Sequence, residues 1–171
     1  MARAFYRGLP MSKHLPTILH LLGSALVVAL TGSSHAETRQ EHVHQMAHEV
    51  MPFELAKTVH IFKMTEFGGI QQVIARDPGA ADQIALIRQH LQQQARRFQD
   101  GDFSDPAKLH GADMPGIRDL QSGSAHLEVS YARIPGGAEI SFRTTDLRLI
   151  TALHRWFGAQ LSEHGADARA D

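Results

Sequence analysis

Polar and apolar residues alternate in two neighbouring stretches toward the end of the chain. Every second residue is apolar in "HLEVSY" at 126–131, and the same holds in "EISFR" at 139–143. This period of two predicts strands with one buried face and one solvated face. Because Pro135-Gly136-Gly137 lies between the two stretches, we expect a β-hairpin with its turn at these residues.

A second hairpin is predicted earlier in the chain, over residues 58–76. The stretches "TVHIFKM" and "IQQVIAR" flank Phe67-Gly68-Gly69. Adjacent glycines supply the positive φ angles of a tight hairpin turn, so we place the turn at Gly68-Gly69.

Each hairpin is followed by apolar residues at the spacing of an amphipathic helix. One stripe predicts a helix from about Ala80 to Gln99, and it consists of Ile84, Ile87, Leu91, Ala95 and Phe98. The other predicts a helix from a cap at 144–146 to about His164, and it consists of Leu147, Ile150, Leu153, Phe157 and Leu161. Residues 102–123 are rich in proline and glycine and predict a connector with one or two short helical turns.

The order of these elements predicts an α+β fold made of two ββα halves. The glycine pairs of the two hairpins lie 68 residues apart, which is typical of a duplicated unit, but two common hairpin-plus-helix units also produce this order by coincidence. The halves most simply form a four-stranded, mainly antiparallel sheet with two helices on one face. We assign this single α+β domain to residues 57–167, followed by a tail at 168–171.

Residues 1–36 have the features of a secretory signal peptide. Basic residues precede an apolar run at 15–30, and Ser34-His35-Ala36 offers a cleavage site after Ala36. Met11 opens a shorter and more conventional signal, so either methionine fits as the start. A retained membrane anchor is the alternative, although the apolar run is short for a span. We expect a periplasmic or secreted protein with no membrane span after cleavage.

Composition narrows the function of the processed chain. Cysteine is absent, which excludes disulfides and thiolate metal sites. All 18 acidic residues but only 14 of the 17 basic residues follow position 36, which leaves a formal charge of −4. A negative chain is poorly suited to a phosphate backbone, so nucleic acid is not an expected partner.

Candidate ligands for a metal ion lie in a His/Met-rich arm at residues 37–56, which contains "EHVHQMAHEVM". On a helix, His44 and His48 share a face one turn apart, and Met51 lies three residues further along. Imidazole suits copper, zinc and nickel, while thioether selects monovalent copper. The alternative is a solvated arm whose histidines bind metals weakly and without consequence.

A second pair of candidate ligands lies in the connector, in the stretch "HGADMPG". The predicted metal site is a subset of the histidines and methionines in these two segments, with copper as the candidate ion: His42, His44, His48, Met51, His110 and Met114. His60, His154 and His164 fall on apolar faces, where a hydrogen-bonded structural histidine is the simpler interpretation for the first and last, and the choice is open for His154.

Catalysis is not predicted, because the chain contains no nucleophile elbow and no cysteine nucleophile. The stretch "SFRTTDLR" offers an anion site at a helix start, but an ordinary capped helix explains it equally well.

Three stretches, "MPFELAKTVHIF", "GDFSDPAKLHGADMPG" and "ALHRWFGAQLSEHGAD", together resemble a family of small exported bacterial proteins, some of which carry the name aspartate carbamoyltransferase. The resemblance covers nearly all of the processed chain and implies membership, but it brings no known active site. It places several polar or sulfur-bearing residues in the shared stretches: His60, His110, Met114, Trp156 and His164. The transferase reaction is not expected, because such enzymes have two α/β domains, a phosphate loop that this chain lacks, and a cytosolic substrate.

The leading hypothesis is a soluble, non-catalytic periplasmic protein that binds a transition metal, preferably copper. The first alternative is an exported interaction module that docks an envelope protein through the sheet or the edge at Trp156, with incidental histidines. A small hydrolase or transferase near His110 and Arg143 is the third.

Overall fold

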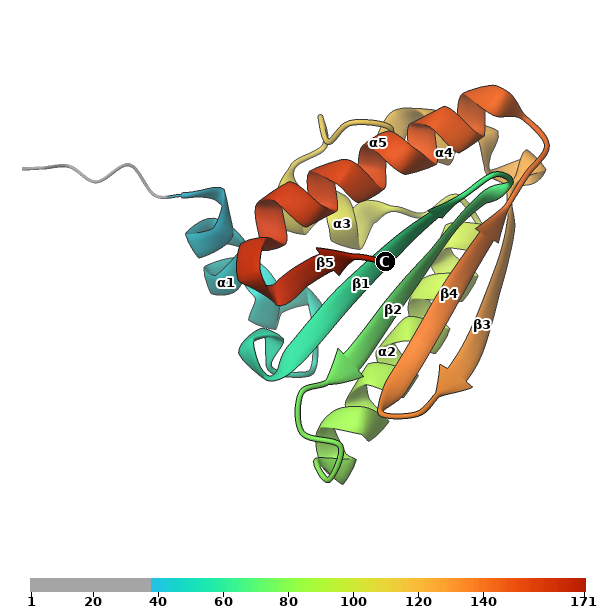
Figure 1. The fold of residues 1–171 in the computed structure, drawn as a ribbon. Coiled ribbons are helices and arrows are strands. Elements are labelled where there is room, and N and C mark those ends of the chain that lie inside the picture. Colours follow the sequence, from blue (N-terminus) through green and yellow to red (C-terminus); the bar gives the residue numbers. More distant parts are fainter. Residues whose placement is uncertain (1–37) are drawn as a thin grey trace, which may run out of the picture. The chain divides into compact units, whose positions relative to one another are not determined.

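The computed structural model describes residues 38–171, so the predicted signal peptide lies outside the described residues. These residues form an α+β fold around one five-stranded sheet with the strand order β3-β4-β2-β1-β5 (Figure 1). The strands are β1 (Thr58–Thr65), β2 (Gly68–Ala75), β3 (Glu128–Ile134), β4 (Gly137–Arg143) and β5 (Ala168–Ala170). Neighbouring strands are antiparallel except β1 and β5, which are parallel.

Five α-helices occur within residues 38–171: α1 (Arg39–Val50), α2 (Ala81–Gln99), α3 (Ser104–His110), α4 (Ile117–Gly123) and α5 (Leu147–His164). Short 3-10 turns lie at Leu55–Lys57, Ser124–His126 and Gly165–Asp167. The predicted α+β class is confirmed, and helices α2 and α5 lie where the apolar stripes predicted them. The predicted sheet of four strands with two helices is corrected to five strands with five helices.

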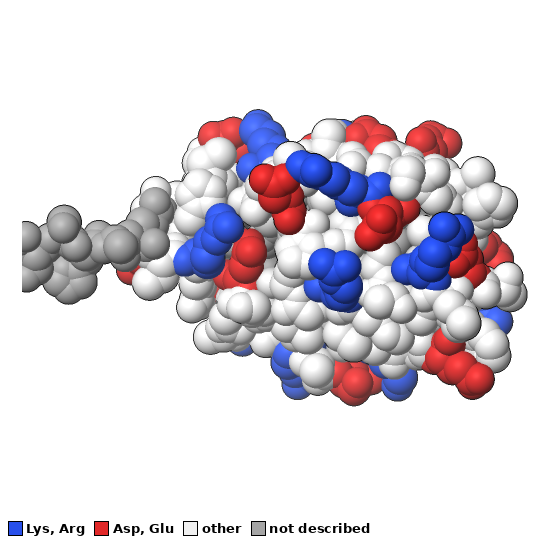
Figure 2. Space-filling view, turned by 90° about the horizontal axis from the view of Figure 1, so that it is seen from above, with Lys and Arg blue, Asp and Glu red and all other residues white. Residues whose placement is uncertain are grey.

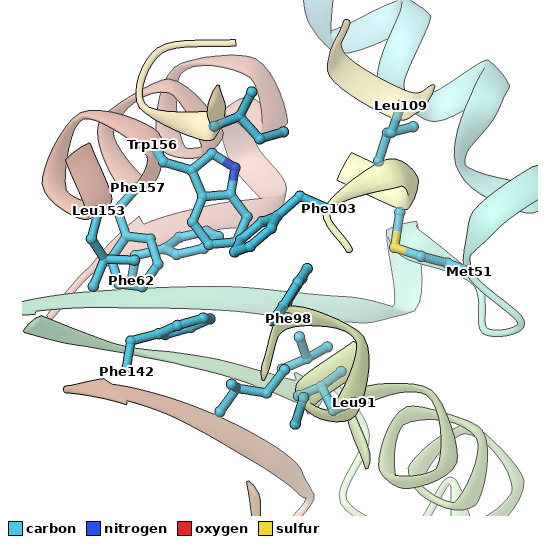
Figure 3. Close-up of a cluster of buried hydrophobic side chains, with 14 of the residues drawn as sticks. Met51, Phe62, Leu91, Phe98, Phe103, Leu109, Phe142, Leu153, Trp156 and Phe157 are labelled. Atoms are coloured by element: carbon cyan, nitrogen blue, oxygen red, sulfur yellow. The ribbon is translucent and has the colours of Figure 1, made fainter. Parts of the chain in front are cut away.

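The core fills the space between one face of the sheet and the helices. Alternate residues of the strands, such as Phe62, Val73 and Ile140, belong to the same buried cluster as the apolar stripes of α2 and α5. Trp156 of α5 is fully buried, and its ring packs edge-on against Phe98 and other aromatic rings (Figure 3). Because Trp156 is buried, it offers no exposed edge on which a partner could dock, contrary to the prediction from the sequence.

The glycine pair of the first hairpin lies in a strand and not in the turn. Thr65 pairs with Gly68, so Glu66 and Phe67 form the turn. A Cβ on Gly68 would lie 2.0 Å from the carbonyl oxygen of Phe142, and a Cβ on Gly69 would lie 2.6 Å from the ring of Phe157. These glycines are required because β4 and α5 approach the strand closely, which the local sequence does not reveal.

The second hairpin has the same arrangement, because Ile134 pairs with Gly137. Its turn is Pro135-Gly136, with a φ of 74° at Gly136. The two ββα units meet where β2 pairs with β4, and each strand begins with a glycine packed against the other unit.

Segments outside the predicted domain also carry regular structure. Residues 37–56, predicted as an arm, contain α1, which starts with a capping box between Thr38 and Glu41. Val43 and Ala47 of α1 are buried in the core. Residues 168–171, predicted as a tail, contain β5.

Charged side chains of both signs are interspersed on the face of the molecule seen in Figure 2. Within residues 38–171, no helix combines the length and apolar character that a membrane span requires.

Candidate functional site

Five buried side-chain polar atoms within residues 38–171 have no hydrogen-bond partner: His60 Nε2, Gln71 Oε1, Gln94 Oε1, Trp156 Nε1 and His164 Nδ1. All five residues line the same cavity, which has a volume of about 60 Å³. Buried polar groups are almost always paired, and each one left unpaired costs about 1–3 kcal/mol. Their convergence on one cavity marks it as the candidate site for a small ligand. Since a water molecule needs about 10–15 Å³, the cavity has room for an ion or a few atoms.

The cavity lies where the sheet, α2 and α5 meet. His60 of β1 and Gln71 of β2 lie on the helix-covered face of the sheet, and Gln94 comes from α2. Trp156 and His164 are eight residues apart on α5, which places them on the same side of the helix. His110, at the end of α3, and Met51, directly after α1, complete one wall. The site thus combines side chains from five elements with Met51, and the residues named here run from position 51 to position 164.

Three buried imidazoles of the cavity lining, those of His60, His164 and His110, lie next to one another in a row. The ring centroids of His60 and His164 are 4.7 Å apart, with the rings nearly parallel, and those of His110 and His164 are 5.0 Å apart. The exposed fraction of each of these residues is 4% or less.

Hydrogen bonds at the other ring nitrogens indicate which atoms carry lone pairs. His110 Nδ1 lies 2.9 Å from Glu163 Oε2, and His164 Nε2 lies 3.2 Å from Gln160 Oε1. Both oxygens accept hydrogen bonds, so these two nitrogens donate. In the neutral rings, His110 Nε2 and His164 Nδ1 therefore carry lone pairs. A hydrogen bond from the second ring nitrogen to an oxygen is the arrangement that orients metal-binding histidines.

Burial keeps these imidazoles neutral. It lowers the pKa of His110 to about 4 and that of His164 to about 3, and it lowers the pKa of His60 well below its ordinary value. Their proximity acts in the same direction, because a charge on one imidazole disfavours a charge on the next: His164 lowers the pKa of His60 further, and His110 lowers that of His164. Neutral imidazole is the form that binds metal ions.

The six residues predicted as metal ligands do not all lie together. Met51 and His110 line the cavity, whereas His48 is exposed and lines a separate surface hollow beside Glu49. Met114 packs in the core. His42 is half-buried on α1.

His44 has a structural partner of its own. Its Nε2 lies 2.5 Å from Asp167 Oδ2, and the other oxygen of Asp167 accepts a hydrogen bond from Arg76 at 2.8 Å. This network ties α1 to the C-terminal segment and to the end of β2. Within residues 38–171, no three or more His, Cys, Asp or Glu side chains are arranged to hold a metal ion.

Several lining residues were not recognised as site residues from the sequence. His60 and His164 stand out in the sequence as polar residues on apolar faces. Gln71 and Gln94 carry the same signal, since each lies in phase with buried neighbours such as Val73 and Leu91. His154 is different, because its Nε2 lies 2.9 Å from the carbonyl oxygen of Gly68 and has a structural role.

The residues suggested for an enzyme site are also separated. His110 lines the cavity, whereas Arg143, the last residue of β4, lines a different hollow together with Phe67 and Thr145. At the start of α5, the carboxylate of Asp146 accepts a hydrogen bond from the backbone N–H of Arg148, so the chain itself supplies the anion at this helix start.

Comparisons with protein-family models, with curated proteins and with solved structures gave no match to this chain.

Proposed function

We propose that this protein is a soluble, non-catalytic periplasmic binding protein that takes a transition-metal ion, preferably copper, into the histidine cavity. The observation that carries the proposal is the convergence of five unpartnered buried polar atoms, two of them imidazole nitrogens, on one small cavity. Neutral imidazole suits copper, zinc and nickel, and Met51 adds a thioether to the lining.

Of the residues predicted from the sequence as ligands, the proposal keeps His110 and Met51 as part of the cavity lining. It adds His60 and His164. The histidines of α1 are not part of the proposed site, and His44 already has Asp167 as its partner.

The test is calorimetric titration of the processed chain, residues 37–171, with copper, zinc and nickel in a buffer that competes weakly for metal. Submicromolar binding of at least one ion supports the proposal. Binding should also raise the midpoint of thermal unfolding, because a ligand that binds only the folded state stabilises it by mass action. Millimolar binding of all three ions would rule the proposal out.

The second candidate is an exported interaction module, which the uncovered face of the sheet favours (Figure 1). The half-buried side chains that point away from the core on β1 and β2 include Val59, Ile70 and Ile74. If a partner protein from the envelope binds there, Ile70→Lys abolishes its capture and leaves metal titration unchanged. The metal proposal predicts the reverse for substitutions in the cavity.

A further inference from the structure

We infer that the ion bound in the cavity is cuprous copper, Cu(I), and that its ligand atoms are His60 Nε2 and His164 Nδ1. This inference rests on the proposed metal-binding function and makes it more specific. It assigns the ligand atoms and the oxidation state of the ion.

The ligand atoms follow from the hydrogen bonds. His164 donates from Nε2 to Gln160, so its lone pair is on Nδ1, which is buried and has no partner. His60 Nε2 is likewise buried without a partner, and it carries a lone pair when the ring hydrogen is on Nδ1. These are the two buried imidazole nitrogens without a partner among residues 38–171, and both residues line the same cavity.

The number of donors selects the ion. Zinc in proteins almost always takes four ligands in a tetrahedron. Within the described part of the chain, no group of three or more His, Cys, Asp or Glu side chains is placed to hold an ion. Cu(I) accepts two nitrogen ligands, and it also accepts thioether, which Met51 offers in the same lining.

The charge of the ion points the same way. Burying an ion costs free energy that rises steeply with its charge. The one carboxylate of the lining, Asp105, is already paired with Arg97, so a monovalent ion is favoured over a divalent one. Two of the other unpartnered atoms, Gln71 Oε1 and Gln94 Oε1, are oxygens whose partial negative charge favours a cation, while only Trp156 Nε1 opposes it.

Binding requires the two rings to move relative to each other. Their centroids are 4.7 Å apart and their planes are inclined by 27°, so their in-plane lone pairs do not point at one another. With metal–nitrogen distances near 2 Å, a linear arrangement places imidazole centroids about 6 Å apart. One of the two rings must therefore turn out of the stack, and a turn of the His60 ring leaves the hydrogen bond of His164 to Gln160 in place.

The experiment measures Cu(I) affinity of the processed chain under anaerobic conditions by competition with bicinchoninate, with Zn(II) and Cu(II) measured in parallel. We expect Cu(I) to bind most tightly. His60→Gln and His164→Gln should each weaken Cu(I) binding more than about 100-fold, because the loss of an outer-shell partner alone typically costs 10–100-fold. The matched controls His48→Gln and His126→Gln, both at exposed positions, should bind like the original chain.

A second measurement does not depend on the variants being folded. Nitrogen NMR of the original chain should show that Cu(I) shifts His60 Nε2 and His164 Nδ1 and leaves His126 unchanged. Tighter binding of Zn(II) or Cu(II), or loss of binding in His48→Gln but not in the two cavity variants, overturns the inference while metal binding stands. If none of these ions binds, the proposed function fails as well.

Discussion

Gly68 is one of the residues at which the backbone leaves no room for a side chain. It has a φ of 143°, and an added Cβ would lie 2.0 Å from the carbonyl oxygen of Phe142. We predict that Gly68→Ala lowers the free energy of unfolding by about 2–4 kcal/mol, because β2 and β4 must separate or distort. Urea unfolding followed by circular dichroism measures this change.

The matched control is Gly158→Ala in α5, where an added Cβ has no neighbour within 4 Å. There the substitution removes the helix penalty of glycine and should raise stability by up to about 1 kcal/mol. Equal effects of the two substitutions would contradict the close-approach explanation for Gly68.

The sequence predicts that some residues of the site are buried, but not which residues they contact. His60 and His164 are recognisable as polar residues in apolar stripes, and so, in retrospect, is Gln94. Their meeting is not recognisable, because it depends on how β1 packs against the end of α5, roughly a hundred residues later in the chain. The local pattern indicates that a side chain is buried, while only the tertiary packing determines which side chain it contacts.

At the scale of elements, α1 closes one wall of the cavity. Val43 is fully buried, and Glu49 of α1 forms an ion pair with Lys108 of α3 at 2.7 Å. We predict that Val43→Asp costs more than about 2 kcal/mol and detaches α1 from the domain, because it replaces a buried apolar side chain with a charge. The measurements are thermal unfolding and hydrogen exchange of the α1 amides.

Detachment of α1 should also expose the imidazole of His110 to a histidine-modifying reagent, because residues at the end of α1 line the same cavity. Gln45→Asp adds the same charge at an exposed position of α1 and should change neither exchange nor labelling. If Val43→Asp leaves His110 protected, α1 does not cover the cavity.

The elements that the sequence predicts well are those with long repeats of a pattern. Helix α2 and helix α5 each show five apolar residues in one stripe, and their observed ends lie within three residues of the predicted ones. Helix α1 buries only Val43 and Ala47 among polar neighbours, and β5 has three residues, so neither carries enough periodicity. These two elements depend on tertiary contacts: β5 pairs with the edge of β1, and α1 packs on the core.

At the scale of the whole molecule, stability should depend on pH through the buried histidines. Burial lowers the pKa of His90 and of His110 to about 4, and that of His164 to about 3. In the unfolded chain these groups titrate near 6.5. As pH falls below 6.5, the unfolded state binds protons that the folded state does not, so the free energy of unfolding falls. Above about pH 7 these histidines have no such effect.

We therefore predict that the metal-free protein loses stability between pH 6.5 and pH 4, on the order of 1 kcal/mol per pH unit for each buried histidine. Carboxylates do not explain a loss that begins near pH 6.5. The pKa of Asp102 is lowered to about 2, chiefly by the hydrogen bond from Arg97, so its contribution is lost only at lower pH. Burial raises the pKa of Glu163, so this group opposes the loss.

Urea unfolding at a series of pH values measures the slope of stability with pH. The substitution His90→Gln should reduce this slope by one histidine's share, whereas His126→Gln, at an exposed position, should leave it unchanged. A stability that stays constant from pH 7 to pH 5 would mean that the folded and unfolded states take up the same protons over this range, so that burial does not hold these imidazoles neutral.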